Sequence, residues 1–434
     1  MKNRFKVSYL QIAFRNLGRY KAKTIITTFA VALTVFLFVV LDSYILGTSQ
    51  DIERYMLLYE SGAARIYSKA YYEKKEYEPL YEGFSDYEKL VMDIEKTGYN
   101  AAPRARFSGT IVSKNEKLPI TMLAVDPDKE KKVLYNHKFI KKGEFVQNGR
   151  FDIVIGQQLA NHLGVTIGDN VQFMTQIEIK ESSGKIRRID QRINFRVGGI
   201  MNTPNVTVNT EMGFTALDVM QDEQGMMLNG QITEICLRDK QADEYDLVLE
   251  TEKTTYIQDK LKSILPDSLM LAGWEEEAKD YINLAEITKM AMWLTLPVFL
   301  ILGLLGIFNT MSIAVKQRYR EIGMLRSMGM FNTEIIRLFL YEAGLIGIIG
   351  TVIGLALGLL ITFYMVYVGI DLTSSIEVAK ESARKAFIIH SAWSFNSYIV
   401  LSILIPLCCA ISAFLPSIKA LKTEISESLR MNII

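Results

Sequence analysis

The segment 315–360 reads VKQRYREIGMLRSMGMFNTEIIRLFLYEAGLIGIIGTVIGLALGLL, and its two halves differ in character. The first half carries basic side chains at intervals, whereas the second has no charged residue from Ala343 onward. An uncharged apolar stretch of this length is typical of a helix that crosses a bilayer, which needs about 20 residues. The segment therefore predicts a short interfacial helix followed by a transmembrane helix.

Three further runs lack Asp, Glu, Lys and Arg over a comparable length. They lie at 25–41, which extends to 46 if Asp42 sits at the interface, at 290–315 and at 391–418. A signal peptide is the alternative for the first run, but its apolar core would span only about 7–15 residues. The sequence therefore predicts four transmembrane helices.

The basic residues predict which side of the membrane each connection occupies, because Lys and Arg near span ends stay cytoplasmic. Three segments are rich in them, and all three fall on one side when four spans alternate. Residues 47–289 and the short loop 371–390 are then extracytoplasmic. The basic residues are Arg15, Arg19, Lys21 and Lys23, then Lys316, Arg318, Arg320, Arg326 and Arg337, then Lys419, Lys422 and Arg430.

The predicted fold is an α-helical membrane protein with four transmembrane helices and a large mixed α/β extracytoplasmic domain inserted between spans 1 and 2. In that domain an apolar strand at 153–155 precedes a helix at 157–163 that ends at Gly164, and a strand alternates at 193–200. Without Pro or Gly from 274 to 296, an unbroken helix is expected to continue into the second span as a stalk, with Pro297 as its weak point. The expected segments are a cytoplasmic amphipathic segment 1–24, spans 25–46, 290–315, 338–370 and 391–418, an outer domain 47–289, a cytoplasmic helix 316–337, an outer loop 371–390 and a cytoplasmic tail 419–434.

Composition and motifs argue against several classes of function. The net charge is +1, which gives no general attraction to nucleic acid. The sequence contains no G-x-x-x-x-G-K-[ST] motif, so the chain carries no P-loop of its own for ATP. Its three cysteines, Cys236, Cys408 and Cys409, and its scattered histidines show no metal-ligand spacing. The carboxylates of the outer domain show no pairing, and no catalytic, cofactor or metal residue is predicted.

Residues 316–330 predict a short amphipathic helix at the cytoplasmic interface. Ile322 and Leu325 share one face, and Gly323 and Gly329 allow another backbone to approach closely. Such a helix suits docking into a groove on a cytoplasmic partner, or it lies on lipid, and the residues alone leave both readings open. The charged residues are Arg318, Arg320, Glu321 and Arg326.

Gly350, Gly354 and Gly358 recur at every fourth position of the third span. Small residues at this spacing let helices approach closely in lipid. The pattern fits tight packing within one chain and equally a seam between two copies.

Five motifs in chain order resemble those of MacB/FtsX-type ABC transporter permeases. The segment REIGMLRSMG at 320–329 resembles the signature R-E-I-G-x-L-R-A-x-G, with Ser327 where Ala is usual. The others are AFRNL at 13–17, GQQLA at 156–160 with Leu163-Gly164 and Gly168-Asp169, Glu342-Ala343 before the glycines, and Pro416 with ESLR at 427–430, where Ser428 replaces the usual Ala.

The resemblance implies a permease that works with a separate cytoplasmic ABC ATPase dimer, which holds the ATP and magnesium. A second permease, identical or paralogous, would pair with it, and ATP-driven closure would reach the outer domain along the stalk (mechanotransmission). The helix between spans 2 and 3 would contact the ATPase. This assigns ATPase coupling to Arg318, Arg320, Glu321, Ile322, Gly323, Leu325, Arg326 and Gly329.

The layout is most similar to LolC/LolE-like lipoprotein-releasing permeases, which lack a fused ATPase. That subgroup implies a bacterial inner (plasma) membrane location, a domain in the periplasm, a periplasmic carrier or adaptor protein and a membrane lipid or lipoprotein substrate. The alternatives are a MacB-like efflux permease for peptides, lipids or drugs, and an FtsX-like regulator of a cell-wall hydrolase.

Overall fold

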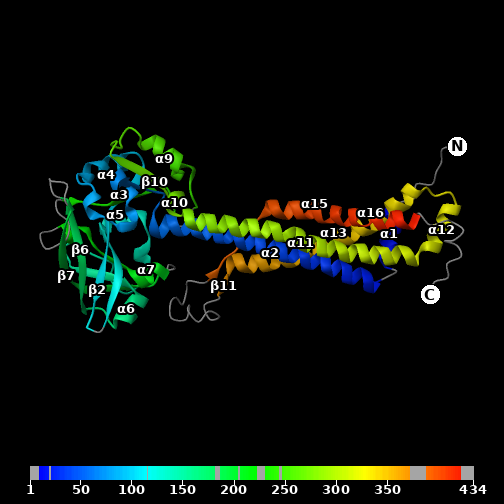
Figure 1. Ribbon diagram of the computed structural model, residues 1–434, viewed down its shortest axis with the longest axis horizontal. Coiled ribbons are helices and arrows are strands. Elements are labelled where there is room, and N and C mark those ends of the chain that lie inside the picture. The colour runs from blue at the N-terminus through cyan, green and yellow to red at the C-terminus, as the bar shows by residue number, and fades with distance from the viewer. Residues whose placement is uncertain are drawn as a thin grey trace. The chain divides into compact units, whose positions relative to one another are not determined.

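The computed structural model describes residues 9–18, 21–114, 116–180, 186–203, 206–221, 230–243, 247–371 and 388–421 (Figure 1). The chain forms two compact units. The first, called the helical unit here, comprises 1–48, 284–369 and 389–434, and the second, called the sheet unit, comprises 49–283 and 370–388.

The helical unit is built from long apolar helices. Within the described residues, three helical stretches are long and apolar enough to cross a membrane, at Thr24–Glu60, Asn332–Tyr367 and Phe395–Lys419. They coincide with the first, third and fourth predicted spans. The helices are α1 (Tyr9–Leu17), α2 (Lys21–Tyr55) with the π-helix η1 (Met56–Glu60), α11 (Lys279–Gln317), α12 (Tyr319–Ser327), α13 (Asn332–Tyr367), α15 (Phe395–Ser412) and α16 (Phe414–Leu421).

The second predicted span, 290–315, lies inside α11, which stays helical through Pro297. The side chains of residues 296, 299, 300, 302 and 303 lie outside the described part, and this span stays a prediction. The expected unbroken helix from Trp274 is wrong at Ala278. A short helix, α10 (Trp274–Glu277), ends there in a turn with φ −88° and ψ 7°, and α11 begins at the next residue.

The sheet unit is a mixed α/β domain, as predicted, around one ten-stranded sheet in the order β10-β1-β9-β2-β3-β8-β5-β7-β4, with β6 paired to β2 and β7. The strands that come first and last along the chain, β1 and β10, are neighbours in the sheet, since Ala64 of β1 pairs with Gly273 of β10. The strands are β1 (Ala64–Ser68), β2 (Tyr99–Val112), β3 (Lys117–Val125), β4 (Ile140–Gly143), β5 (Asp152–Gly156), β6 (Asn170–Lys180), β7 (Ile186–Met201), β8 (Met212–Ala216), β9 (Glu234–Asp239) and β10 (Leu269–Gly273).

Short helices connect and cover the strands. They are α3 (Lys69–Glu73), α4 (Tyr87–Lys96), α5 (Pro127–Val133), α6 (Gln157–Leu163), α7 (Val206–Glu211), α8 (Leu217–Gln221) and α9 (Thr254–Leu261). The predicted helix 157–163 is confirmed as α6. Its C-cap Gly164 has φ 65°, the left-handed conformation in which glycine is favoured. The strand predictions at 153–155 and 193–200 are confirmed within β5 and β7. A two-stranded sheet joins β11 (Ile370–Asp371) and β12 (Ile388–Ile389).

The centre of the large sheet has one apolar and one polar face, because side chains alternate along each strand. Ala64 and Ile66 of β1 and Ile235 and Leu237 of β9 belong to the main hydrophobic core, together with Val91 and Ile94 of α4 and Ile257 and Leu261 of α9. The residues between them on β1, β9 and β2 point to the opposite face. That face carries Arg65, Tyr67, Glu234, Arg104 and Arg106.

Candidate functional site

The helix α12 has one buried face and one exposed face. Ile322 is only 3% exposed and packs with Val315, Ile335 and Phe339 inside the helical unit. Gly323 is also buried, and Leu325 and Arg326 are half-buried. The exposed face instead carries Arg320 and three large apolar side chains, Met324, Met328 and Phe331, of which Met328 is 75% exposed. Ile322 therefore holds α12 onto α13, and its role in ATPase coupling stays a prediction.

Arg318 anchors the start of α12 in a buried ion-pair cluster. Its Nη1 donates to both carboxylate oxygens of Glu342 at 2.8 and 3.2 Å, and its Nε donates to Glu321 at 3.0 Å. The guanidinium carbon lies 5.4 Å from the ring centroid of Phe339. Burial alone would lower the pKa of Arg318, but Glu342 and Glu321 raise it above its ordinary value, so the residue stays charged. The cluster ties the beginning of α12 to α13.

Two more of the motif segments meet at the same cluster. Asn16, from the AFRNL motif on α1, donates through Nδ2 to Oε1 of Glu342. Glu342 is the first residue of the Glu342-Ala343 motif on α13. Glu321 lies within the 320–329 motif, and Arg318 lies two residues before it. Segments up to 326 residues apart in the chain therefore share one carboxylate. The sequence placed these motifs in order but gave no indication that one side chain joins them.

Gly329 lies in the turn that ends α12. Its φ is +91°, and a Cβ atom added there would meet nothing within 4 Å. The N–H of Met330 donates to the carbonyl of Leu325, and the N–H of Gly329 donates to that of Arg326. This is the Schellman arrangement, in which a left-handed residue ends a helix. The glycine therefore fixes where α12 ends, and its expected role in the close approach of a partner stays a prediction.

The three glycines of α13 face α2 of the same chain. A Cβ atom added at Gly350, Gly354 or Gly358 would lie 2.5–2.8 Å from an atom of α2, which is closer than real Cβ contacts come. The atoms belong to Val31, Ala32 and Val39, respectively. In this chain the glycines therefore allow close helix packing within one copy.

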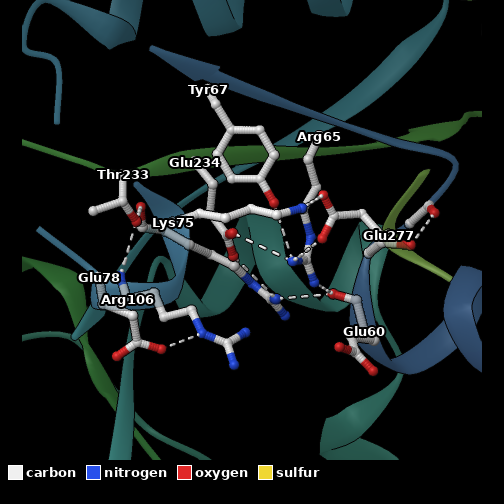
Figure 2. A network of polar contacts seen from close by, with 12 residues as sticks. Glu60, Arg65, Tyr67, Lys75, Glu78, Arg106, Thr233, Glu234 and Glu277 are labelled. Atoms are coloured by element: carbon white, nitrogen blue, oxygen red, sulfur yellow. Dashed lines mark hydrogen bonds and ion pairs between the residues drawn. The ribbon is translucent and has the colours of Figure 1, made fainter. Parts of the chain in front are cut away.

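The polar face of the large sheet holds a network of charged side chains, called the charge network here (Figure 2). Arg65 Nη1 lies 3.5 Å from Glu234 and 3.4 Å from Glu277, and Arg104 Nη1 lies 3.7 Å from Glu234. Arg104 also forms a two-bond pair with Glu130 of α5, with its Nε 2.9 Å from Oε2. Four basic and four acidic groups take part, Arg65, Arg104, Arg106 and Lys75 with Glu78, Glu130, Glu234 and Glu277.

The charge network also holds the residues next to two long helices. Both Arg65 and Arg104 donate to the main-chain carbonyl of Glu60, the last residue of η1, with 3.1 Å from Arg104. Glu277, the last residue of α10, accepts from Arg65 and from Lys75. The end of the α2–η1 helix and the approach to α11 are thus fixed to the central strands by charged groups.

Charge neutralisation explains how these groups remain buried. Burial alone would raise the pKa of Glu234, but Arg65, Arg104 and Arg106 lower it below its ordinary value. Burial raises the pKa of the neighbouring Cys236 thiol to about 12. An ionised carboxylate among guanidinium groups is a structural arrangement, because every oxygen faces a positive partner. Within the described residues no group of three or more His, Cys, Asp or Glu side chains is placed to hold a metal ion.

The pairing of outer-domain carboxylates with arginines was not predicted from the sequence. One signal was present in the sequence, because charged residues interrupt otherwise apolar strands. Arg65 does so on β1, and Arg104 and Arg106 stand two positions apart on β2. Alternation predicts a shared face within each strand, but it does not predict which strands pair. The register that sets Arg104 opposite Glu234 came only with the structure.

Apolar helices long enough to cross a bilayer, with a large α/β domain inserted after the first, indicate a membrane protein with one large inserted domain. Two family models match the chain, the MacB-like periplasmic core domain at residues 24–248 and the FtsX-like permease C-terminal at 293–425. The first covers more than half of the chain. The protein therefore belongs to the MacB/FtsX-type family of ABC transporter permeases, as the motifs indicated.

Two relatives found by sequence similarity agree with this assignment. The lipoprotein-releasing system transmembrane protein LolC of Xylella fastidiosa strain 9a5c is 22% identical over 322 residues, which covers 72% of this chain and 73% of the relative. An uncharacterised ABC transporter permease of Methanocaldococcus jannaschii is 22% identical over 97% of both chains. The crystal structure of the extracellular domain of the transporter YknZ from Gram-positive bacteria matches with a TM-score of 0.31 and 13% identity, over 48% of this chain and 98% of that one.

Proposed function

We propose that this chain is a permease subunit that releases lipoproteins from the plasma membrane, driven by ATP hydrolysis in a separate cytoplasmic ATPase. In this proposal the ATPase carries the ATP and magnesium and binds α12. A second permease, identical or paralogous, completes the transporter. The sheet unit lies outside the cytoplasm and acts on a lipoprotein that a periplasmic carrier then receives.

The observation that carries the proposal is the geometry of α12. A helix of nine residues exposes Met324 and Met328, with Phe331 directly after it, while its other face is packed into the chain. Exposed methionines form adaptable apolar contact surfaces. A helix that only lay on lipid would not require Arg318 to fix its start and Gly329 to fix its end. Both anchors favour a rigid projection that fits a groove on a partner.

The path from α12 toward the sheet unit is supported by the helices themselves. The helix α11 runs without interruption from Lys279 to Gln317, a length of about 58 Å at 1.5 Å per residue. Arg318 follows its last residue, and Glu277 of the charge network lies two residues before its first. A long uninterrupted helix with an ion pair close to each of its ends suits the transmission of movement.

The lipoprotein substrate is proposed from the relatives. Several of the curated relatives are named as LolC proteins of lipoprotein-releasing systems, at 22–24% identity over 60–72% of this chain. The chain contains no P-loop, which fits a permease that depends on a separate ATPase.

The experiment tests docking and release together. The chain is expressed with its cognate ATPase, purified, and reconstituted with an acylated lipoprotein. Met328→Glu places a charge in the proposed docking surface, and we expect co-purification of the ATPase and ATP-dependent lipoprotein release both to fall at least tenfold. Met92→Glu is the matched control, since Met92 is 54% exposed on α4 of the sheet unit, and it should leave ATPase binding unchanged.

Two results would contradict different parts of the proposal. If Met328→Glu binds the ATPase as well as the wild type, the docking role of α12 is wrong. If the wild-type complex hydrolyses ATP without releasing any lipoprotein but transports peptides or drugs, the substrate is wrong and the MacB-like alternative holds.

A further inference from the structure

We propose that a groove between α13 and α15 binds one acyl chain of an anionic phospholipid, with the lipid phosphate held by Arg337. The groove has a volume of about 440 Å³. Its α13 side includes Arg337, Tyr341 and Ile348, and its α15 side includes Ile403 and Leu407. This inference concerns the helical unit alone and does not rest on the proposed transport activity.

The walls of the groove suit a hydrocarbon chain. Ile348, Ile403 and Leu407 are 49–66% exposed, so their apolar surface is available to a ligand. The floor is formed where the helices come close, since a Cβ atom added at Gly344 would lie 3.6 Å from the Cβ of Ala410. Small residues at the floor and larger residues along the rim produce a channel between the two helices.

One end of the groove is positively charged. Arg337 is exposed, is the one charged residue among those that line the groove, and makes no ion pair with any residue that the structure describes. Tyr341 lies one turn further along the same face of α13 and is 42% exposed. A tyrosine and an arginine at the end of an apolar helix face are typical of the level of lipid headgroups.

The length of the groove matches one leaflet. From Arg337 to Ile348 the helix rises through eleven residues, which is about 16 Å. Half of a bilayer's hydrocarbon core is about 15 Å. An acyl chain that starts below a phosphate at Arg337 would therefore fill the groove to its end.

The charge favours a lipid over a second copy of this chain as the occupant. An apolar helix of another protein placed in the groove would cover Arg337 without a partner, and an unpaired charge at an apolar surface is costly. A phospholipid with a net negative headgroup supplies the missing charge and the apolar chain in one molecule. A headgroup without net charge supplies a weaker attraction near the same arginine.

Native mass spectrometry of the full chain in detergent tests the proposal, with phosphatidylglycerol and phosphatidylcholine of identical acyl chains as probes. We expect the wild type to bind phosphatidylglycerol about fivefold more tightly, as one arginine near a headgroup allows. Arg337→Gln should remove this preference, and Gly344→Leu, which fills the floor, should weaken both lipids. Lys419→Gln is the control, because Lys419 lies on α16 and does not line the groove.

The outcomes separate the possible occupants. Equal binding of both lipids by the wild type, or a preference that survives Arg337→Gln, overturns the proposal. A change from dimer to monomer in Gly344→Leu, with lipid binding unchanged, assigns the groove to a second copy and also overturns it. Loss of the preference in Arg337→Gln alone supports the proposal even if Gly344→Leu fails to fold.

Discussion

Replacing Glu234 by Gln removes one negative charge from the charge network and leaves the shape of the side chain nearly unchanged. Glu234 is 1% exposed, and its carboxylate lies 3.5 Å from Arg65 and 3.7 Å from Arg104. Removing one partner of a buried ion pair costs about 3–5 kcal/mol. Because Arg65 keeps Glu277 and Arg104 keeps Glu130, we expect a loss at the lower end, about 3 kcal/mol.

Hydrogen exchange measured by mass spectrometry on the full chain in detergent reports the loss of stability in the strands around Glu234. A loss of about 3 kcal/mol in the free energy of opening corresponds to roughly 100-fold faster exchange of the amides in β1 and β9. Glu250→Gln is the control in the same unit, because Glu250 is 84% exposed and pairs with Lys253 at 2.8 Å. An exposed pair contributes at most about 1 kcal/mol. Equal exchange rates in the two variants would refute the reasoning that burial makes the network strong.

Three further predictions follow from the described contacts. The pKa of Glu234 is lower in the folded chain than in the unfolded chain. Its ionised carboxylate therefore stabilises the folded state above the ordinary pKa of about 4.3, and this stabilisation is lost as the pH falls below that value toward the folded pKa. The stability difference between the wild type and Glu234→Gln should therefore narrow as the pH falls through about 4, and a constant difference in acid titrations of exchange would contradict this. Gly354→Leu should lower the thermal unfolding temperature in detergent, because a Cβ atom there would lie 2.5 Å from the carbonyl oxygen of Ala32 on α2. Gly306→Leu on α11 is the control and should not lower it, because a Cβ atom there would meet nothing within 4 Å among the described residues. Cys236 should resist iodoacetamide at pH 8 in the folded chain, since its pKa of about 12 and its burial leave almost no thiolate, and rapid labelling detected by peptide mapping would show that the sheet opens.

The sequence predicted those features that depend on neighbouring residues. Uncharged runs located three of the long apolar helices, and Gly164 located the C-terminal end of α6. The pattern at 316–330 predicted a short helix, and the structure has one at 319–327. Each of these signals lies within a single stretch of chain, where periodicity and capping residues act directly.

The features that the sequence missed depend on residues far apart in the chain. A helical pattern shows that α12 has two faces, but only the position of α13 decides that Ile322 is covered and Met328 is exposed. The spacing of Gly354 fits a partner in the same chain as well as one in another copy, and only the contact with Ala32 selects the former here. Pairing of Arg104 with Glu234 required the register between β2 and β9, which no local pattern encodes.

The pairing of the first and last strands of the sheet makes the domain removable. Ala64 and Gly273 lie opposite each other in an antiparallel pair, where Cα atoms are about 4.5–5.5 Å apart. The polypeptide therefore leaves and returns at one point, and a turn of a few residues could replace more than 200 without stretching either neighbouring helix. A scaffold with such an insertion point can exchange its inserted domain while its helices stay the same.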